Sequence, residues 1–278
     1  GDEIRVYPLS FSEFYNAYDG DRHNAWQEYF TYGGMPFIMR KKTHEEKAQY
    51  LQNLFDKIYI SDIVERNKIL HEKSVLDELL NIISSSIGSL TNPSNIAKTF
   101  HSVRQIDIDS ATVARYLDFF IDSFMISKAE RYDVKGRKYI GSPLKYYFSD
   151  VGLRNARLNF RQQEENHIIY NELQYRDFNV DVGVVEYNHR DESGKSVRSR
   201  LEIDFVASKG SKKYYVQSAL SVSDEEKRLQ ETNSLYRVAD SFKKIVVVKD
   251  RIIPWHDEKG VLYIGIEQFL LDETSMDL

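Results

Sequence analysis

Apolar residues recur at helical spacing between residues 11 and 66, interrupted by a Gly-Gly-Met-Pro sequence at 33–36 that predicts a turn. Asn24 is placed to cap one of these helices, and a long helix is predicted to begin near Thr43. We therefore expect residues 1–70 to form a helical linker.

In residues 71–155 the spacing of apolar residues predicts three short helices followed by two strands. The third helix is expected to begin at Asp109, and strands are predicted at 126–132 and 138–140, around a turn at 133–136. Three helices followed by a β-hairpin are typical of a winged-helix domain. The third helix carries a continuous apolar stripe made of Val113, Tyr116, Leu117, Phe120, Ile121 and Phe124.

Residues 156–278 alternate between helical and strand patterns in the order αβββαβ, which is the order of the restriction-endonuclease-like core. The predicted fold class is therefore α+β and multi-domain: the helical linker and the winged-helix domain precede a restriction-endonuclease-like α/β domain with a mixed sheet. Its helices are predicted at 164–177 and 224–239, and its strands at 180–187, 201–207, 213–222 and 245–248.

A nuclease core of this kind holds Mg²⁺ with carboxylates and usually adds a lysine that helps to activate water. The expected signature is an acid on the first helix, an Asp at the end of one strand, and Glu-x-Lys on the next strand. Glu165 and Asp204 fill the first two places, but Gln217 and Ala219 stand where Glu and Lys belong. We therefore expect Glu165, Asp204 and Gln217 to be the relic of a catalytic site, and we assign no metal site.

Other interpretations of these residues remain open. Glu165 and Asp204 can be ordinary surface acids, and Gln217 can satisfy buried backbone groups of the sheet instead of binding a metal. Alternatively, the chain is an active metal-dependent nuclease whose lysine has migrated to Lys213 or Lys227. If the fold is right, the three relic residues converge in space on the face covered by the first helix of the domain.

The predicted hairpin is basic, whereas the predicted third helix is not. Arg115 on that helix is flanked by Asp109, Asp118 and Asp122, which repel phosphate. The net charge is -5 and the pI about 5.9, so any nucleic-acid contact must come from a local patch. A protein-docking role for this domain is equally open. The candidate nucleic-acid-binding residues are Arg115, Lys128, Arg131, Lys135, Arg137 and Lys138.

Composition restricts the remaining functions. The chain has no cysteine, which excludes disulfides and thiolate metal sites, and its seven histidines do not cluster, which argues against a zinc site. No apolar run is long enough for a membrane helix and no signal peptide opens the chain, so we expect a cytoplasmic protein with no membrane partner. Because the chain begins with Gly1 and enters a strand-like stretch at once, we expect it to be part of a longer protein.

Several short motifs follow one another along nearly the whole chain, at residues 7–14, 32–36, 62–66, 132–138, 145–154, 165–173 and 202–207. In this order they resemble the C-terminal region of prokaryotic AAA-family ATPases that carry a trailing domain of unknown function. In that family an ATP-binding domain precedes the position of Gly1, and Gln217 resembles the family's own degenerate form of the nuclease motif.

The resemblance implies a recognition or coupling function for this region, with the protein's own N-terminal ATPase domain as one partner. The candidates for a second partner are DNA and a protein. The remaining alternative is a pure protein-interaction module that does not contact nucleic acid. The sequence leaves the oligomeric state open. No cofactor is expected here, because the chain contains no Gly-x-x-x-x-Gly-Lys-Ser/Thr sequence; ATP and Mg²⁺ are expected only for the ATPase domain.

Overall fold

The computed structural model describes residues 5–55, 60–69, 73–161, 164–190, 193–222 and 224–278. The chain divides into two compact units: the first unit comprises residues 1–128 and 143–171, and the second unit residues 129–142 and 172–278. The described residues form eleven α-helices and one mixed sheet of eight strands, so the α+β class expected from the sequence is confirmed. The two units follow other boundaries than the three predicted domains, because the segment 71–155 contributes to both.

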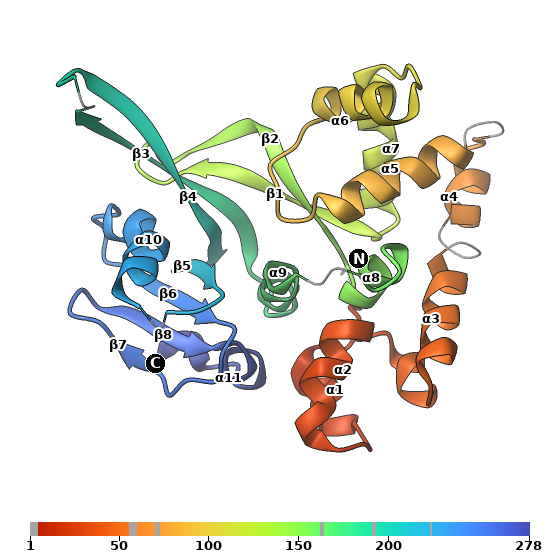
Figure 1. Ribbon diagram of the computed structural model, residues 1–278, viewed down its shortest axis with the longest axis horizontal. Coiled ribbons are helices and arrows are strands. Elements are labelled where there is room, and N and C mark those ends of the chain that lie inside the picture. Colours follow the sequence, from red (N-terminus) through yellow and green to blue (C-terminus); the bar gives the residue numbers. More distant parts are fainter. Residues whose placement is uncertain (1–4, 56–59, 70–72, 162–163, 191–192, 223) are drawn as a thin grey trace. The chain divides into compact units, whose positions relative to one another are not determined.

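Helices make up most of the first unit (Figure 1). Thr43 and Glu46 form a capping box at the start of α3, as a helix beginning near Thr43 requires. Asn24 stands at the start of α2 but makes no capping hydrogen bond with its side chain. The helices are α1 (Phe11–Ala17), α2 (Ala25–Tyr32), α3 (His44–Asn53), α4 (Ser61–Arg66), α5 (Lys73–Ser85), α6 (Pro93–Thr99), α7 (Ser110–Asp122), α8 (Val151–Arg157) and α9 (Glu165–Tyr175), the last of which continues into the second unit.

Shorter helical turns complete the first unit, and none of the described helices is both long and apolar enough to cross a bilayer. Two turns of 3-10 helix, η1 (Arg22–Asn24) and η2 (Pro36–Arg40), flank α2, and a π-helical turn, η4 (Phe100–Arg104), follows α6.

Helix α7 buries the predicted apolar stripe except at its C-terminal end. Its first four members are buried, and the side chain of Asp109 caps the helix by accepting the backbone N–H of Thr112 at 2.8 Å. The helix ends at Asp122, and Phe124 takes a left-handed conformation with φ of 57°. Phe124 is therefore 66% exposed, and the prediction that it continues the stripe of this helix is wrong.

Asp150 joins α8 to the glycine turn that follows α2. One carboxylate oxygen accepts the backbone N–H of Gly34 at 2.7 Å, and the other caps α8 by accepting the N–H of Leu153 at 3.0 Å. Burial raises the pKa of Asp150 to about 6, although these backbone N–H groups act in the opposite direction. The sequence motifs around residues 32–36 and 145–154 therefore have a structural role: they join two helical segments.

The polar side chains of α8 also close the ends of neighbouring helices. Asn155 donates to the carbonyl oxygens of Phe30 and Thr31 at the end of α2, at 2.9 and 3.0 Å. Arg154 donates to the carbonyl oxygen of Ser84 at the end of α5, at 3.0 Å. Because the last carbonyl groups of a helix have no partner within it, these bonds satisfy groups that burial would otherwise leave unpaired.

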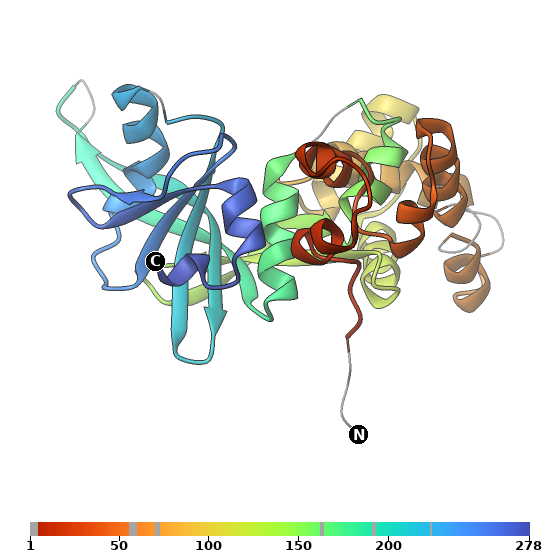
Figure 2. The same ribbon diagram turned by 90° about the horizontal axis from the view of Figure 1, so that it is seen from below.

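The strands of the sheet lie in the order β2-β1-β3-β4-β5-β6-β8-β7 (Figures 1 and 2). β3, β4 and β5 pair antiparallel in sequence order, whereas β5, β6 and β8 pair parallel. The strands are β1 (Ile126–Asp133), β2 (Lys138–Phe148), β3 (Asn179–Arg190), β4 (Ser196–Lys209), β5 (Lys212–Ala219), β6 (Lys243–Val248), β7 (Trp255–His256) and β8 (Val261–Gly265).

Four of the strands differ clearly from the sequence prediction in length. β2 was expected at 138–140 but continues to Phe148, and β5 was expected to reach residue 222 but ends at Ala219. The β3–β4 hairpin is longer than predicted, because β3 continues to Arg190 and β4 already begins at Ser196. Because the residues around Ser193 and Gly194 are polar, the sequence predicted a turn between strands ending at residue 187 and beginning at residue 201. The cross-strand pairing instead continues as far as Arg190 and Ser196.

One face of the second unit's sheet is covered by α10 (Glu225–Tyr236), whose Leu235 lies in a buried apolar cluster with strand residues. The cluster includes Tyr215 and Ala219 of β5, Val246 of β6 and Tyr263 of β8. These strand residues occupy alternate positions, as one face of a sheet requires. The chain ends with α11 (Ile266–Leu271), which packs against β6 and β8, and a short turn of 3-10 helix, η5 (Ser275–Asp277).

Candidate functional site

Asp204 of β4 and Gln217 of β5 are neighbours where these two strands stop pairing. The antiparallel ladder ends at the pair Phe205–Val216. Beyond it, the backbone N–H of Asp204 donates to Oε1 of Gln217 at 3.2 Å, and the backbone N–H of Ser218 donates to Oδ2 of Asp204 at 2.9 Å. These two hydrogen bonds are named the Asp204–Gln217 clasp. The side chains thus satisfy backbone groups that the ladder leaves over, which was one of the alternatives for Gln217.

A bulge in β4 surrounds Asp204. β3 pairs Asp181 with Val206 but Gly183 with Ile203, so β4 contains one more residue than β3 over this stretch. Bulges bend a strand and re-aim its side chains. Here the bulge coincides with the residue whose carboxylate turns to the backbone of β5.

Gln217 faces α10, where it meets an acid that the sequence interpretation missed. Burial raises the pKa of Glu231 on α10, and a hydrogen bond from the side chain of Gln217 partly opposes that shift. Because Oε1 of Gln217 accepts from Asp204, its amide nitrogen is the group that donates to Glu231. The sequence interpretation had assigned this side of the sheet to the helix that is now α9.

The chemistry that this arrangement supports is structural. Oε1 of Gln217 is the atom that could have been offered to a metal, and it is engaged by the backbone of β4. Ala219, at the place of the expected lysine, is 4% exposed and belongs to the apolar cluster under α10. Over the described ranges, no three His, Cys, Asp or Glu side chains are grouped so that they could hold a metal ion.

Gln217→Ala is expected to lower the free energy of unfolding by about 1–3 kcal/mol. The substitution removes the acceptor of the backbone N–H of Asp204, a residue that is only 8% exposed. Chemical denaturation of the two proteins measures the difference. Ser218→Ala is the matched control, since only the backbone N–H of Ser218 takes part in the clasp. Equal losses in the two variants would show that the amide of Gln217 has no specific role.

Glu165, the third member of the predicted relic site, is the first residue of α9 and is half-buried. It belongs to the first unit, whereas Asp204 and Gln217 belong to the second. The convergence of all three residues therefore stays a prediction.

The two lysines proposed as migrated catalytic residues differ in their distance from the clasp. Lys213 lies four residues before Gln217 on β5, which corresponds to about 13 Å along the strand. Its ammonium group lies 5.0 Å from the centre of the Tyr132 ring. Lys227 lies on the exposed surface of α10, one helical turn before Glu231. The ammonium group of Lys227 forms an ion pair with Asp224, the N-cap of the same helix, at 3.4 Å, and an active nuclease with a migrated lysine stays a prediction.

The basic hairpin is held in the sheet at its tip. β1 pairs in parallel with β3 through residues 131–133, and Nζ of Lys135 donates to the carbonyl oxygen of Glu186 at 2.9 Å. The sequence predicted a hairpin without this pairing, because a contact between residues fifty positions apart leaves no local signal. Of the candidate nucleic-acid-binding residues, the second unit holds Arg131, Lys135, Arg137 and Lys138, and the first unit holds Arg115 and Lys128.

Two further cations lie beside this hairpin, on β4. Arg198 forms an ion pair with Glu186, and Arg200 forms another at 2.8 Å. Arg198, Glu186 and Lys135 line an open hollow of about 740 Å³. The sequence analysis began this strand at residue 201 and so left both arginines outside it. The alternation Arg-x-Arg was the signal that could have identified them as one face of a strand.

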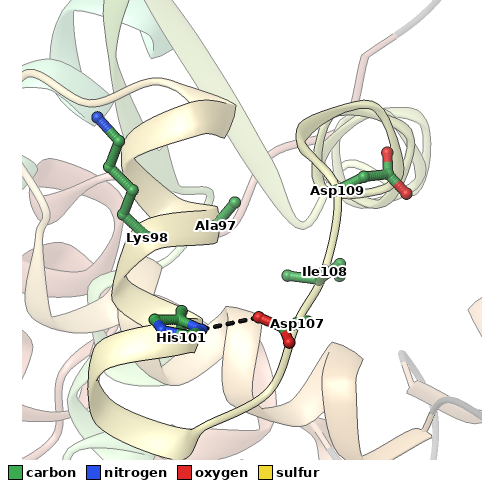
Figure 3. Close-up of a pocket in the computed structure, with 6 residues that line it drawn as sticks. All are labelled: Ala97, Lys98, His101, Asp107, Ile108 and Asp109. Atoms are coloured by element: carbon green, nitrogen blue, oxygen red, sulfur yellow. Dashed lines mark hydrogen bonds and ion pairs between the residues drawn. The ribbon is translucent and has the colours of Figure 1, made fainter.

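A second hollow, of about 510 Å³, lies beside the N-terminal end of α7 (Figure 3). Nδ1 of His101 and Oδ1 of Asp107 are joined by a hydrogen bond of 2.7 Å across it, and both side chains are largely exposed. Asp107 and Asp109 both line it from the loop that leads into α7; Asp107 points toward His101, whereas the carboxylate of Asp109 points away from Lys98. Two carboxylates at this end of α7 disfavour a bound phosphate there.

Comparisons with known proteins place the chain among uncharacterised relatives. A family model described as a domain of unknown function (DUF8612) matches residues 23–164. An uncharacterised protein of Haemophilus influenzae is 31% identical over 255 residues, which cover 88% of this chain and 59% of the relative. The uncharacterised protein MJ1544 of Methanocaldococcus jannaschii is 24% identical over 293 residues, which cover 98% of this chain and 60% of the relative. The chain thus spans about three fifths of the length of these relatives.

Among solved structures, protein VC1899 from Vibrio cholerae matches 95% of this chain and 59% of its own, with 11% identity and a TM-score of 0.25. A TM-score this low carries no argument about fold or function.

Proposed function

The chain belongs to the DUF8612 family, and we propose that it acts in recognition and coupling instead of catalysis. In this proposal, the second unit is a restriction-endonuclease-like domain whose metal site has become a structural contact. The observation that carries the proposal is the Asp204–Gln217 clasp, because the groups at the expected metal position hydrogen-bond the backbones of β4 and β5.

The order of elements supports the nuclease-like part of the proposal. α9, β3, β4, β5, α10 and β6 follow one another as αβββαβ, the three-strand stretch is antiparallel, and β6 returns parallel to β5. A parallel return of this kind requires a crossover connection, which α10 provides. Asp204 and Gln217 lie on neighbouring central strands, as the acids of the nuclease motif would.

A strand contact in the first unit supports the winged-helix part. α5, α6 and α7 precede the β1–β2 hairpin, and Thr91 between α5 and α6 pairs with Leu144 of β2. The two backbone hydrogen bonds of this pair are both 2.8 Å long. Thr91 thus adds a third strand position beside the hairpin. The order of three helices followed by a hairpin is the one expected of a winged helix.

The coupling role rests on the resemblance to AAA-family ATPases and on the length of the relatives. The relatives extend beyond the matched region by about two fifths of their length, which leaves room for a further domain. In this proposal that domain is the ATPase, it holds the ATP and Mg²⁺, and the described region binds a partner and transmits binding to it. The full-length protein would act in the cytoplasm.

DNA is the partner that the charge distribution favours, through the hairpin and not through α7. The exposed face of α7 carries Arg115 together with Asp118 and Asp122, and the hollow at its N-terminal end carries two more carboxylates. Lys135, Arg137 and Lys138 lie instead within four residues of one another in and beside the β1–β2 turn.

Changing Lys135, Arg137 and Lys138 together to Ala is expected to weaken DNA binding and to flatten its salt dependence. Each lost phosphate contact lowers the slope of log K against log salt concentration by about one. Fluorescence anisotropy with a labelled duplex, measured at several salt concentrations, gives both quantities. Equal affinity and slope for the variant and the wild type would exclude the hairpin, and an absence of binding in both would favour a protein partner.

A further inference from the structure

Three cations of the second unit meet at one glutamate. The carboxylate of Glu186 on β3 pairs with Arg198 and with Arg200 of β4, and its backbone carbonyl accepts from Nζ of Lys135. One carboxylate compensates one positive charge, so the group of four residues keeps an excess of two. Both arginine side chains remain accessible, with 68% and 60% of their surface exposed.

The strand geometry places these cations on one face. Arg198 and Arg200 are alternate residues of β4, so their side chains leave the same side of the hairpin. The residues opposite them on β3 are Asn188 and Glu186, and the next pair outward joins Arg190 to Ser196. The exposed arginine at position 190 therefore extends the same face toward the tip of the hairpin.

The acids close to this face do not cancel its charge. Asp133 lines the hollow but is 8% exposed, and its Oδ1 is engaged by the backbone N–H of Gly136 at 2.9 Å. Glu202 is exposed on the same face of β4, two residues beyond Arg200 toward the root of the hairpin. Among the described residues of the outer hairpin, Arg190, Arg198 and Arg200 outnumber Glu186 and Glu202; Asp191 and Glu192 lie outside the described residues.

We propose that Arg198 and Arg200, held in position by Glu186, bind the phosphate backbone of duplex DNA together with the β1–β2 turn. This inference rests on the proposed function and adds two residues and a ligand geometry to it. A duplex is favoured over a single strand because single-strand binding uses free aromatic faces on which bases stack. Tyr187, an aromatic residue that lines the hollow with Arg198, has one face covered by the guanidinium group of Arg237, 3.9 Å from the ring centre.

The test uses three variants of the whole chain and a labelled duplex of mixed sequence in a salt titration. Arg198→Ala/Arg200→Ala is expected to weaken binding at least tenfold and to lower the log–log salt slope by about two, one for each phosphate contact. Glu186→Gln is expected to tighten binding several-fold, because it removes a negative charge from beside the phosphates. Lys209→Ala is the matched control: Lys209 is an exposed, ion-paired cation at the other end of β4, and its loss should leave binding unchanged.

Several outcomes would overturn the inference. If the double arginine variant binds with wild-type affinity and slope while Lys135→Ala/Arg137→Ala/Lys138→Ala loses binding, the proposed function stands and this inference fails. Tighter binding of a single strand of the same length would replace the duplex by a single-stranded ligand. Competition by polyglutamate as effective as by unlabelled duplex would indicate an acidic protein surface as the partner. Circular dichroism of each variant confirms that the sheet is intact.

Discussion

Gly152→Ala is expected to lower the free energy of unfolding of the first unit by about 3 kcal/mol or more. A Cβ atom at this position would lie 1.9 Å from the carbonyl oxygen of Tyr32 and 2.9 Å from the backbone nitrogen of Gly33. These are backbone atoms, so no side-chain rotation removes the overlap. The new methyl group must push α8 away from the end of α2, which would disturb the hydrogen bonds of Asp150 and Asn155 at the same contact.

Urea denaturation followed by tryptophan fluorescence measures this effect. Trp26 lies in the first unit and Trp255 in the second, so a Trp255→Phe background reports on the first unit alone. Gln52→Ala, at an exposed position of α3 in the first unit, is the control. A loss below about 1 kcal/mol for Gly152→Ala would contradict the packing described for α8.

His167 is expected to make the first unit sensitive to acid. Its imidazole is fully buried, and burial lowers its pKa to about 3, although the hydrogen bond to the carbonyl oxygen of Phe148, 2.6 Å from Nε2, acts in the opposite direction. In the unfolded chain the pKa of histidine is about 6.5. Between these two values the unfolded state binds a proton that the folded state does not, so stability falls as the pH falls.

The size of this effect follows from the shift. At about 1.4 kcal/mol per pKa unit, lowering the pH from about 6.5 to about 4 removes roughly 3 kcal/mol of stability through His167. Asp150 acts with the opposite sign: its pKa is raised to about 6, so the folded state gains the extra proton between about pH 6 and the unfolded value of 3.8. The two groups therefore compensate partly over this window, and the contribution of His167 appears only by comparison with a variant.

His167→Gln removes the titrating group and keeps a hydrogen-bond donor. The stability advantage of the wild type over this variant is expected to shrink by roughly 3 kcal/mol between about pH 6.5 and about pH 4. Urea denaturation at a series of pH values, in the Trp255→Phe background, gives this difference directly. His23→Gln, at an exposed position of the first unit, controls for the exchange itself. A difference between wild type and His167→Gln that stays constant with pH would mean that His167 is not buried in its neutral form.

Much of the fold could be predicted from local patterns. The capped start of α7 at Asp109, its four buried apolar residues and the αβββαβ order each depend on residues close in sequence. The parts that could not be predicted depend on distant pairing. The tip of the β1–β2 hairpin joins β3 through partners fifty residues away, and the long β3–β4 hairpin runs through polar residues that favour a turn when they are considered alone.

The candidate site shows the same division. Asp204 and Gln217 were found from the spacing of a known motif, and their strands are neighbours as expected. Glu231 was missed because sequence periodicity does not reveal which helix covers which face of a sheet. Arg198 and Arg200 were missed because their meeting with Glu186 depends on the cross-strand register, which no local pattern specifies.

The central claim, that the residues at the nuclease position hold the sheet together and do not cleave DNA, is tested most directly by a cleavage assay. Plasmid and linear duplex DNA are incubated with the wild-type chain and with Asp204→Ala, in Mg²⁺ and in Mn²⁺. In the proposed nuclease-like domain, Gln217 and Ala219 stand where the acid and the lysine that activate water are expected, so both proteins should leave the DNA intact with either ion. Metal-dependent cleavage by the wild type that disappears in Asp204→Ala would contradict the account and make the chain an active nuclease.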